Sequence, residues 1–325
     1  MKINILFDFR LYVNKKESDI LEKMNSLLIT GATGFIGSWL TRFFLDEKFH
    51  IIAHGSSKGS IEGLKSKLPN NGNSLENLDF WVQDFMDEKW KYPDFSALDY
   101  IIHCAALTSV RNSTRENYDR YFTVNVLGTK RLGAQAYDQN IDHFIHLSSG
   151  QIYGKPNSYP INQTTIKEPI NMYGYTKLMS EEVVKSFGTF GLPFTIFRPF
   201  SVYGPEQSNV ISIFAERMQQ KKSVTIFGDG TQKRAFTHIR DICNAISLLL
   251  NNPNAFGNEY NLSGPEEFSI NELVSLLSKH FRISPEIIHK DSKVDELSRN
   301  LVDTQPLKEL GFEYNHYLEE YIKKM

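Results

Sequence analysis

A tyrosine and a lysine at helical spacing are the first candidates for chemistry. Tyr173 and Lys177 stand at the start of a helical pattern that continues to Phe187, and this spacing places both side chains on one helix face. The pKa of a free tyrosine is about 10, so it is a poor base at neutrality, but a nearby ammonium favours the phenolate. We therefore expect the pair to exchange a proton with a sugar or alcohol hydroxyl, and the lysine to bind ribose hydroxyls. The alternative is a solvated helix face.

A serine at the end of an apolar run is the second candidate. Ser149 follows the run His143–Leu147, which predicts a buried strand. A hydroxyl delivered at the end of such a strand can orient a substrate oxygen and stabilise charge on it. The alternative is a Ser/Gly turn that binds nothing.

Three glycines at three-residue spacing form the third feature. Gly31, Gly34 and Gly37 lie between the apolar run 27–30 and an amphipathic segment. A strand that passes through glycines into a helix offers backbone N–H groups and a positive helix end to a pyrophosphate. Glycine allows the close approach that a side chain would prevent. With a strand before it and a helix after it, the turn predicts a dinucleotide site.

The end of the next strand bears on which dinucleotide is bound. An NAD site usually has an acid there, about 20 residues after the glycines, which accepts bonds from the ribose 2′-hydroxyl. Here the segment contains His54, Ser56, Ser57 and Lys58 and no acid. We therefore expect NADP as the favoured cofactor, with NAD as the alternative if backbone groups hold the ribose. Asp84, at the end of the third strand, is a candidate to bind the adenine amino group.

The elements that must position these residues alternate between strand and helix. This alternation is typical of a Rossmann-type α/β fold with a doubly wound parallel sheet. Apolar runs predict further strands at His50–Ala53, Leu78–Val82, Tyr100–Ala105, Phe194–Phe197, Val224–Phe227 and Tyr260–Leu262. Helical patterns cover Tyr118–Tyr137, Tyr173–Phe187, Ile211–Gln220, Asp241–Leu250 and Asn271–Phe281.

Three parts follow from this pattern. Residues 1–24 are an N-terminal extension without an assigned role. Residues 25–199, with about 236–260, are expected to form the dinucleotide-binding domain, and residues 200–235 with 261–325 a smaller C-terminal substrate-binding lobe. Ligands of such folds bind at the carboxyl ends of the strands.

Composition excludes several classes of function. The chain of 325 residues has a net charge of -2 and therefore no basic field for nucleic acid or an anionic membrane. No run approaches the roughly 20 apolar residues of a membrane span. Cys104 and Cys243 are the only cysteines, too few for a disulfide framework, which fits a cytoplasmic protein. The histidines show no metal-ligand spacing, so no metal is expected.

Taken together, the motifs resemble those of the extended short-chain dehydrogenases/reductases, in the nucleotide-sugar epimerase/dehydratase branch. The resemblance runs from about residue 26 to the C-terminus. Besides the glycine turn, Ser149 and the Tyr173/Lys177 pair, it is carried by the segments His103-Cys104-Ala105-Ala106, Asn125-Val126-Leu127-Gly128-Thr129, Arg198-Pro199-Phe200-Ser201-Val202-Tyr203-Gly204-Pro205 and Arg234-Ala235-Phe236-Thr237-His238-Ile239-Arg240-Asp241.

The resemblance implies a role for each matching residue. Tyr173 would be the acid/base, Lys177 would tune its pKa and hold ribose, and Ser149 would bind the substrate oxygen. The expected cofactor-binding residues are Gly31, Thr33, Gly34, Phe35, Ile36, Gly37, His54, Ser56, Ser57, Lys58, Asp84, Phe85, Ala105, Ala106, Asn125, Tyr173, Lys177 and Pro199. The expected substrate-binding residues are Thr108, Ser149, Gly150, Gln151, Phe200, Ser201 and Arg234, the last facing the diphosphate of a nucleotide sugar.

One departure narrows the reaction. The 4,6-dehydratases carry Asp-Glu directly after the catalytic hydroxyl residue, and the UDP-glucuronate decarboxylases keep a Glu there. This chain has Gly150 and Gln151, which cannot exchange a proton. Hydride transfer at a sugar carbon, most often C4, remains. A 4-ketoreductase that uses NADPH is slightly favoured because the second strand ends without an acid; the alternative is an NAD-dependent 4-epimerase of the UDP-hexose type.

Other classes are weighed beside these. A non-catalytic NADP-binding regulator would usually lack the Tyr/Lys pair, and a steroid or flavonoid reductase does not need the Arg234 segment. The expected partners are a nucleotide-sugar substrate and a second copy of the chain, because the helices at Tyr118–Tyr137 and Tyr173–Phe187 resemble those that pair in family dimers. The identity of the sugar is expected to depend on pocket residues such as Thr108, Val110, Gln207, Asn209 and Val210.

Overall fold

The fold is built on one parallel sheet of seven strands. The computed structural model describes residues 24–68, 76–291 and 299–325, so all but the last residue of the predicted extension 1–24 lies outside the described residues. In spatial order the strands are β11 (Asn258–Leu262), β6 (Phe194–Pro199), β5 (His143–Leu147), β4 (Tyr100–His103), β1 (Ser26–Thr30), β2 (His50–Gly55) and β3 (Leu78–Val82). All six pairings are parallel.

Strand β1 lies near the centre of this sheet and ends at the glycine turn. All five of its residues are buried, as expected of a parallel strand that is covered on both faces. Its neighbours are β2, the next strand along the chain, and β4, so the strand order reverses beside it. Ligands of doubly wound sheets bind at such a reversal, outside the carboxyl ends of the strands.

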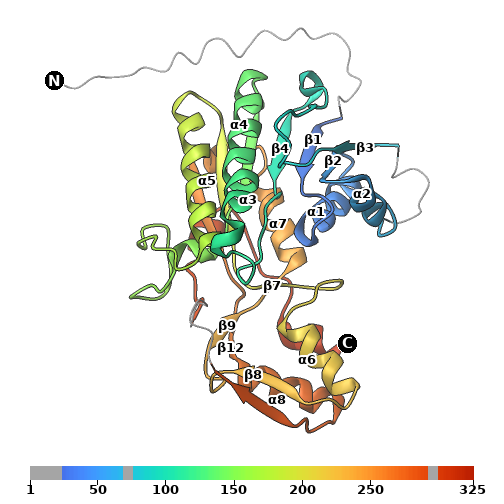
Figure 1. Ribbon diagram of the computed structural model, residues 1–325, viewed down its shortest axis with the longest axis vertical. Helices are drawn as coiled ribbons and strands as arrows, with labels where there is room; N and C mark the ends of the chain where they lie inside the picture. Colours follow the sequence, from blue (N-terminus) through green and yellow to red (C-terminus); the bar gives the residue numbers. More distant parts are fainter. Residues whose placement is uncertain (1–23, 69–75, 292–298) are drawn as a thin grey trace, which may run out of the picture.

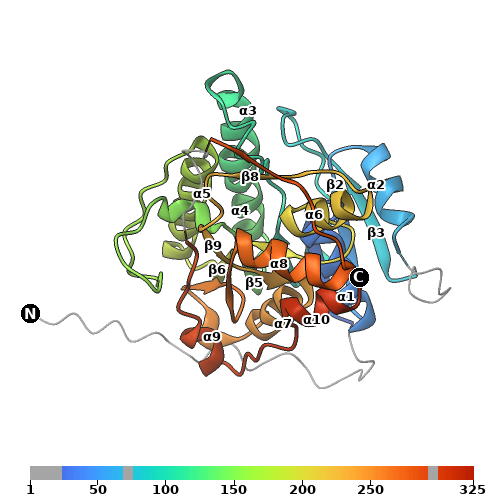
Figure 2. The same ribbon diagram turned by 90° about the horizontal axis from the view of Figure 1, so that it is seen from below.

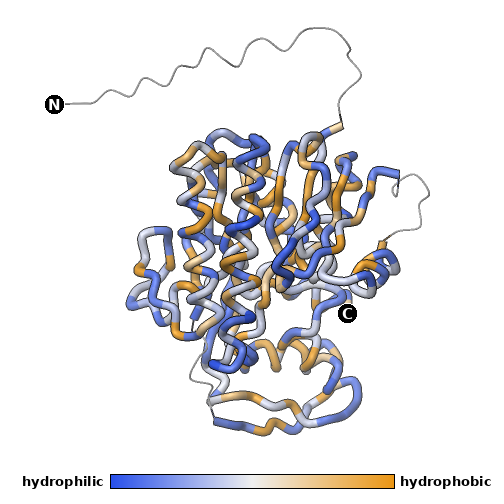
Figure 3. The backbone as a smooth tube through the Cα atoms, turned by 45° about the horizontal axis from the view of Figure 1, so that its top comes forward, coloured by the Kyte–Doolittle hydropathy of each residue, from blue (hydrophilic) through white to orange (hydrophobic). Residues whose placement is uncertain are grey.

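Helices cover both faces of the sheet (Figure 1). One apolar core joins strand residues to α1 (Phe35–Asp46), α2 (Lys58–Lys65), α7 (Ile239–Leu249) and α9 (Gln305–Glu309). A second core joins the opposite face to α4 (Gly128–Asp138) and α5 (Met172–Thr189). Apolar stretches follow the strands and helices, whereas several outer loops are hydrophilic (Figure 3).

The long helix predicted over Tyr118–Tyr137 is interrupted. The chain forms α3 (Tyr118–Phe122), then a π-helical turn at Thr123–Leu127, and then α4. The buried Asn125 lies in this turn. Its Oδ1 accepts a hydrogen bond from Leu107 N at 2.8 Å, and its Nδ2 donates to Thr176 Oγ1 at 2.9 Å. The turn lets one side chain bind the loop after β4 and helix α5 together.

A smaller lobe lies beyond the carboxyl edge of the sheet, as Figures 1 and 2 show from two directions. Its own apolar core joins residues from 203–236, 270–277 and 318–322. The helices of this lobe are α6 (Val210–Gln219), α8 (Ile270–Phe281) and α10 (Leu318–Lys323). The two-stranded sheets outside the central sheet pair β7 (Val202–Tyr203) with β10 (Thr237–His238), β8 (Val224–Phe227) with β13 (Ile287–Lys290), and β9 (Lys233–Ala235) with β12 (Glu267–Ser269).

Among the residues that the structure describes, no helix combines the length and the hydropathy that crossing a bilayer requires. The same ranges contain no group of three or more His, Cys, Asp or Glu side chains arranged to hold a metal ion.

Candidate active site

A cavity of about 510 Å³ opens at the carboxyl ends of the strands, beside the glycine turn. It brings together residues predicted separately for cofactor binding, catalysis and substrate binding. The predicted residues that line it are Gly31, Thr33, Gly34, Phe35, Ile36, Gly37, His54, Ser56, Asp84, Phe85, Ala105, Ala106, Thr108, Ser149, Tyr173, Lys177 and Pro199.

Two glycines of the turn are required by close backbone contacts. Gly31 has φ +66°, and a Cβ there would lie 2.8 Å from the backbone of Ala105. A Cβ on Gly37 would lie 2.2 Å from the carbonyl oxygen of Gly31. Backbone cannot move aside as a flexible side chain can, so the turn keeps its shape only with glycine at these positions.

The helix that follows the turn has a free N-terminal end. Gly34 is the N-cap of α1, and no side chain caps the helix. The first amide groups of a helix have no partner within it, and its dipole favours negative charge there. Because these amides border the cavity, the residues present fit the pyrophosphate of a dinucleotide.

His54 occupies the end of β2, where an NAD site usually has an acid. Its Nδ1 accepts a hydrogen bond from Gly31 N at 3.1 Å, and its Nε2 donates to the carbonyl of Gln83 at 2.9 Å. Burial lowers the pKa of this imidazole to about 4, so the ring is neutral at pH 7. Both nitrogens are used within the protein, and the ring stacks on Phe85 at 4.6 Å. His54 therefore shapes the glycine turn and offers no charge to a ribose phosphate.

Three predicted cofactor residues do not line the cavity. Ser57 is the N-cap of α2 and accepts a hydrogen bond from Ser60 N at 3.2 Å, and the exposed Lys58 begins that helix. Asn125 is buried against α5 and the loop after β4. Of the polar side chains predicted at the end of β2, Ser56 is the exposed one that borders the cavity.

The catalytic candidates meet on one wall. Tyr173 lies in the first turn of α5, which Asn171 caps by accepting a hydrogen bond from Gly174 N at 2.8 Å. Ser149 is the N-cap of the turn Gly150–Tyr153, where its hydroxyl accepts a hydrogen bond from Gln151 N at 3.2 Å, and its side chain acts on the Tyr173 phenol to lower the pKa of that group. Lys177 lies one helical turn beyond Tyr173 and is 2% exposed. The three side chains therefore adjoin the same space.

The pKa values on this wall are governed by burial. Burial raises the pKa of Tyr173 to about 12, although the Ser149 side chain opposes the rise. Burial lowers the pKa of Lys177 to about 8, against the attraction of the Glu181 carboxylate. The lowered Tyr173 pKa that the sequence led us to expect is therefore wrong for the protein alone. Removing the phenolate from water raises the pKa more than Ser149 lowers it.

Five predicted substrate residues lie outside the cavity lining, and each has another contact. The Gln151 side chain accepts a hydrogen bond from Asn171 Nδ2 at 3.0 Å. Phe200 is buried and covers Gly150, where a Cβ would lie 2.2 Å from its ring. Ser201 accepts a hydrogen bond from Asn300 Nδ2 at 2.7 Å. The fifth residue, Arg234, is half-buried in β9.

Sequence reasoning missed part of the lining. Thr108 and Gln207, expected to influence sugar identity, line the cavity, whereas Val110, Asn209 and Val210 do not. The missed residues are Gln83, Met86, Cys104, Leu107, Arg120, Val124, Leu147, Ser148 and Val202. Of these, Cys104 and Val202 lie in segments that carry the family resemblance but were given no role, and loops and strand ends bring the others to the cavity.

Comparison with known proteins agrees with this site. Residues 27–263 match the model of the family described as "NAD dependent epimerase/dehydratase family". A putative UDP-glucose 4-epimerase of Methanocaldococcus jannaschii is 31% identical over 309 residues, which cover 92% of this chain and 96% of the relative.

Solved structures lead to the same family. The UDP-glucuronic acid 4-epimerase of Bacillus cereus, in complex with UDP-glucuronic acid and NAD, superposes with a TM-score of 0.81 at 27% identity, covering 92% of this chain and 96% of that one. The UDP-glucose 4-epimerase of Thermotoga maritima, with UDP-glucose, superposes with a TM-score of 0.82 at 29% identity and the same coverage. This chain belongs to the NAD dependent epimerase/dehydratase family, the nucleotide-sugar branch of the extended short-chain dehydrogenases/reductases.

Proposed function

We propose that the protein is a nucleotide-sugar 4-epimerase that retains its nicotinamide dinucleotide between turnovers. The observation that carries the proposal is the meeting of Ser149, Tyr173 and Lys177 on one wall of a cavity whose described lining holds no carboxylic acid beside them. Among the described residues that line the cavity, Asp84 is the one carboxylate, and its Oδ1 accepts a hydrogen bond from Met86 N at 2.9 Å. One acid/base suffices to oxidise and reduce a carbinol, whereas dehydration needs further acids.

Dehydration is disfavoured by packing as well as by residue type. The position directly after Ser149 has no room for a side chain, because the Phe200 ring fills it. The amide of Gln151 is bound to Asn171, the cap of the helix that carries Tyr173. An acid at position 150 would require Phe200 to move, whereas a Glu at position 151 could still accept the bond from Asn171 Nδ2.

The proposed mechanism assigns one task to each side chain. A bound nicotinamide would supply the hydride acceptor and donor at C4. Tyr173 takes the proton of the sugar O4 during oxidation and returns it during reduction, and Ser149 holds that oxygen by a hydrogen bond. The Lys177 ammonium stabilises the phenolate and binds ribose hydroxyls. Rotation of the 4-keto sugar between the two transfers presents its other face and inverts C4.

The relatives support epimerisation over the 4-ketoreductase that the sequence slightly favoured. Both solved neighbours described above are 4-epimerases, and the complex from Bacillus cereus contains NAD. The expected preference for NADP has no such support. His54 is uncharged and bound within the protein, and Ser57 and Lys58 lie outside the cavity. We therefore propose NAD as the retained cofactor.

Two further expectations remain proposals. We propose that Arg234 binds the diphosphate of the substrate, because a guanidinium can donate to two phosphate oxygens at once. We also propose a homodimer through α3, α4 and α5. These helices leave large apolar side chains exposed, and a second copy would cover them. The exposed residues are Tyr118, Tyr137, Tyr175, Met179 and Phe190, which ends α5.

A single incubation tests the proposed function. The purified protein is mixed with UDP-glucose and no added cofactor, and the products are separated by chromatography. Formation of UDP-galactose is expected, because the retained dinucleotide is regenerated in each turnover. If the sugar nucleotide is unchanged until NADPH and a 4-keto substrate are added, the protein is a ketoreductase. If no sugar nucleotide reacts although the dinucleotide is bound, it is a non-catalytic regulator.

A further inference from the structure

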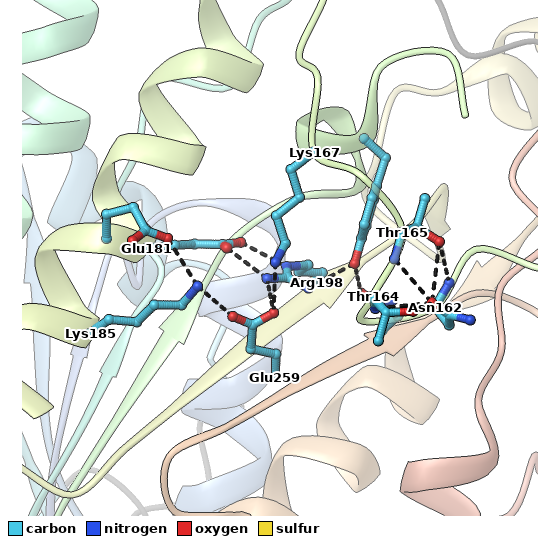
Figure 4. A network of polar contacts seen from close by, with 11 residues as sticks. Asn162, Thr164, Thr165, Lys167, Glu181, Lys185, Arg198 and Glu259 are labelled. Atoms are coloured by element: carbon cyan, nitrogen blue, oxygen red, sulfur yellow. Dashed lines mark hydrogen bonds and ion pairs between the residues drawn. The ribbon is translucent and has the colours of Figure 1, made fainter. Parts of the chain in front are cut away.

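A buried polar network surrounds Arg198, a residue outside the cavity wall (Figure 4). Its side chain is fully buried in β6. Its Nε and Nη2 donate to the two carboxylate oxygens of Glu181 at 2.8 and 2.7 Å, and its Nη1 donates to the Tyr153 hydroxyl at 2.7 Å. That hydroxyl donates to Asn261 Oδ1 at 2.9 Å, and Glu259 accepts a further bond from Nη2. We call these five residues the Arg198 network.

Three segments of this network also carry residues of the active site. Glu181 lies one helical turn beyond Lys177 on α5. Tyr153 ends the short helical turn that Ser149 begins. Arg198 directly precedes Pro199, which lines the cavity. The network therefore joins helix α5, which carries Tyr173 and Lys177, to the turn that carries Ser149.

The chemistry of the network suits positioning better than simple stabilisation. A buried ion pair gains little net stability, because the cost of removing both charges from water offsets their attraction. A guanidinium with two bonds to one carboxylate nevertheless fixes distance and direction, which an apolar contact does not. The hydrogen bond from Arg198 to the Tyr153 hydroxyl also fixes the guanidinium relative to the turn that carries Ser149.

We propose that Arg198 fixes the turn carrying Ser149 against the helix carrying Tyr173 and Lys177, with Tyr153 and Glu181 as the two contacts through which it acts. The inference rests on the proposed function, since it concerns the same hydroxyl pair. Arg198, Tyr153 and Glu181 do not line the cavity, and we assign them as positioning residues. A small displacement of the serine turn misplaces the hydrogen bond to the sugar oxygen, which lowers kcat while leaving the nucleotide contacts in place.

The test is a pair of matched substitutions. Tyr153→Phe removes only the hydroxyl that Arg198 and Asn261 bind. We expect kcat for the sugar nucleotide to fall about tenfold, with KM and the retained dinucleotide within about twofold of the parent. Tyr203→Phe is the control, because Tyr203 is equally buried and its hydroxyl has no hydrogen-bond partner among the described residues. It should behave like the parent.

A double-mutant cycle separates positioning from general damage. If Tyr153 acts through Ser149, Tyr153→Phe should lower kcat less than about twofold in a Ser149→Ala background. An undiminished loss in that background, or equal losses in Tyr153→Phe and Tyr203→Phe, would overturn the proposal. Glu181→Gln repeats the cycle from the helix side and replaces Tyr153→Phe if that variant does not fold.

Failure of the proposed function is recognised separately. If the parent protein converts no sugar nucleotide, the epimerase assignment fails. The role of the Arg198 network is then tested by spectroscopy instead of kinetics. A 3-fluorotyrosine placed at position 173 should then show a ¹⁹F resonance that shifts in Tyr153→Phe and not in Tyr203→Phe. An unchanged resonance in both variants would overturn the role of the Arg198 network.

Discussion

The two sides of the cavity, which we propose as its nucleotide side and its sugar side, are built differently. On the nucleotide side, backbone forms the surface: the turn Gly31–Gly37 and the uncapped start of α1 approach the space directly. On the sugar side, side chains from separate segments meet, with Ser149 from a turn after β5, Tyr173 from α5 and Gln207 from the loop before α6. Backbone surfaces follow from glycine spacing, whereas side-chain surfaces depend on how loops pack.

The largest expected effect separates the two sides. Tyr173→Phe should reduce turnover by about 10³-fold, because the acid/base is lost. Binding of the dinucleotide should stay within about threefold of the parent, since the glycine turn is untouched. A fixed-time assay measures the turnover of the variant, and calorimetry measures its affinity for the dinucleotide. Retained turnover in Tyr173→Phe would remove Tyr173 from the mechanism.

A substitution in the glycine turn should weaken binding of the dinucleotide. In Gly37→Ala the new Cβ meets the Gly31 carbonyl at 2.2 Å, so the turn must shift. We expect dinucleotide affinity to fall about a hundredfold, since displacements of about 1 Å have effects of this size. Gly63→Ala is the matched control, because a Cβ on Gly63 in α2 meets nothing within 4 Å. Equal dinucleotide affinity in both variants would contradict the account of the turn.

The smallest expected effect concerns pH and the sugar side alone. Lys177, with its pKa lowered to about 8, holds its proton below that pH and loses it above. The proposed mechanism needs the Lys177 ammonium and the Tyr173 phenolate together, and the pKa of Tyr173 is about 12. We therefore expect kcat/KM to rise about tenfold per pH unit up to about pH 8 and to level off above it, where the gain in phenolate is cancelled by the loss of the ammonium. Lys177→Arg keeps its charge, so its kcat/KM should continue to rise above pH 8 at reduced activity; an unmoved break would assign it to another group.

The fold was largely predictable because parallel strands are continuous apolar runs. The predicted bounds of Leu78–Val82 and His143–Leu147 match β3 and β5. The break at Thr123–Leu127 was not predictable, because neither proline nor glycine lies within it and its cause is a tertiary contact of Asn125. In the smaller lobe, the predicted strand Val224–Phe227 matches β8. The other short strands outside the central sheet were missed, because runs as short as Val202–Tyr203 carry no periodicity.

The sequence predicted which residues of the candidate site come together, but not how their neighbours pack around them. Motif spacing predicted the glycine turn and the three side chains Ser149, Tyr173 and Lys177 that line the cavity. It could not show that Phe200 fills the space beside Gly150, or that Gln151 binds the cap of α5. It also assigned His54 to the cofactor, whereas both ring nitrogens bind the protein itself. These contacts join segments that are separated in the chain, so they cannot be predicted from a local sequence pattern.

The most direct test of the central claim follows the hydrogen at C4. UDP-glucose labelled with deuterium at C4 is incubated with the protein without added cofactor, and the product is examined by NMR and mass spectrometry. An epimerase that returns the same hydride to the opposite face yields UDP-galactose with the deuterium retained at C4. A C4 epimer that has lost the deuterium, or the absence of any C4 epimer, would contradict the account.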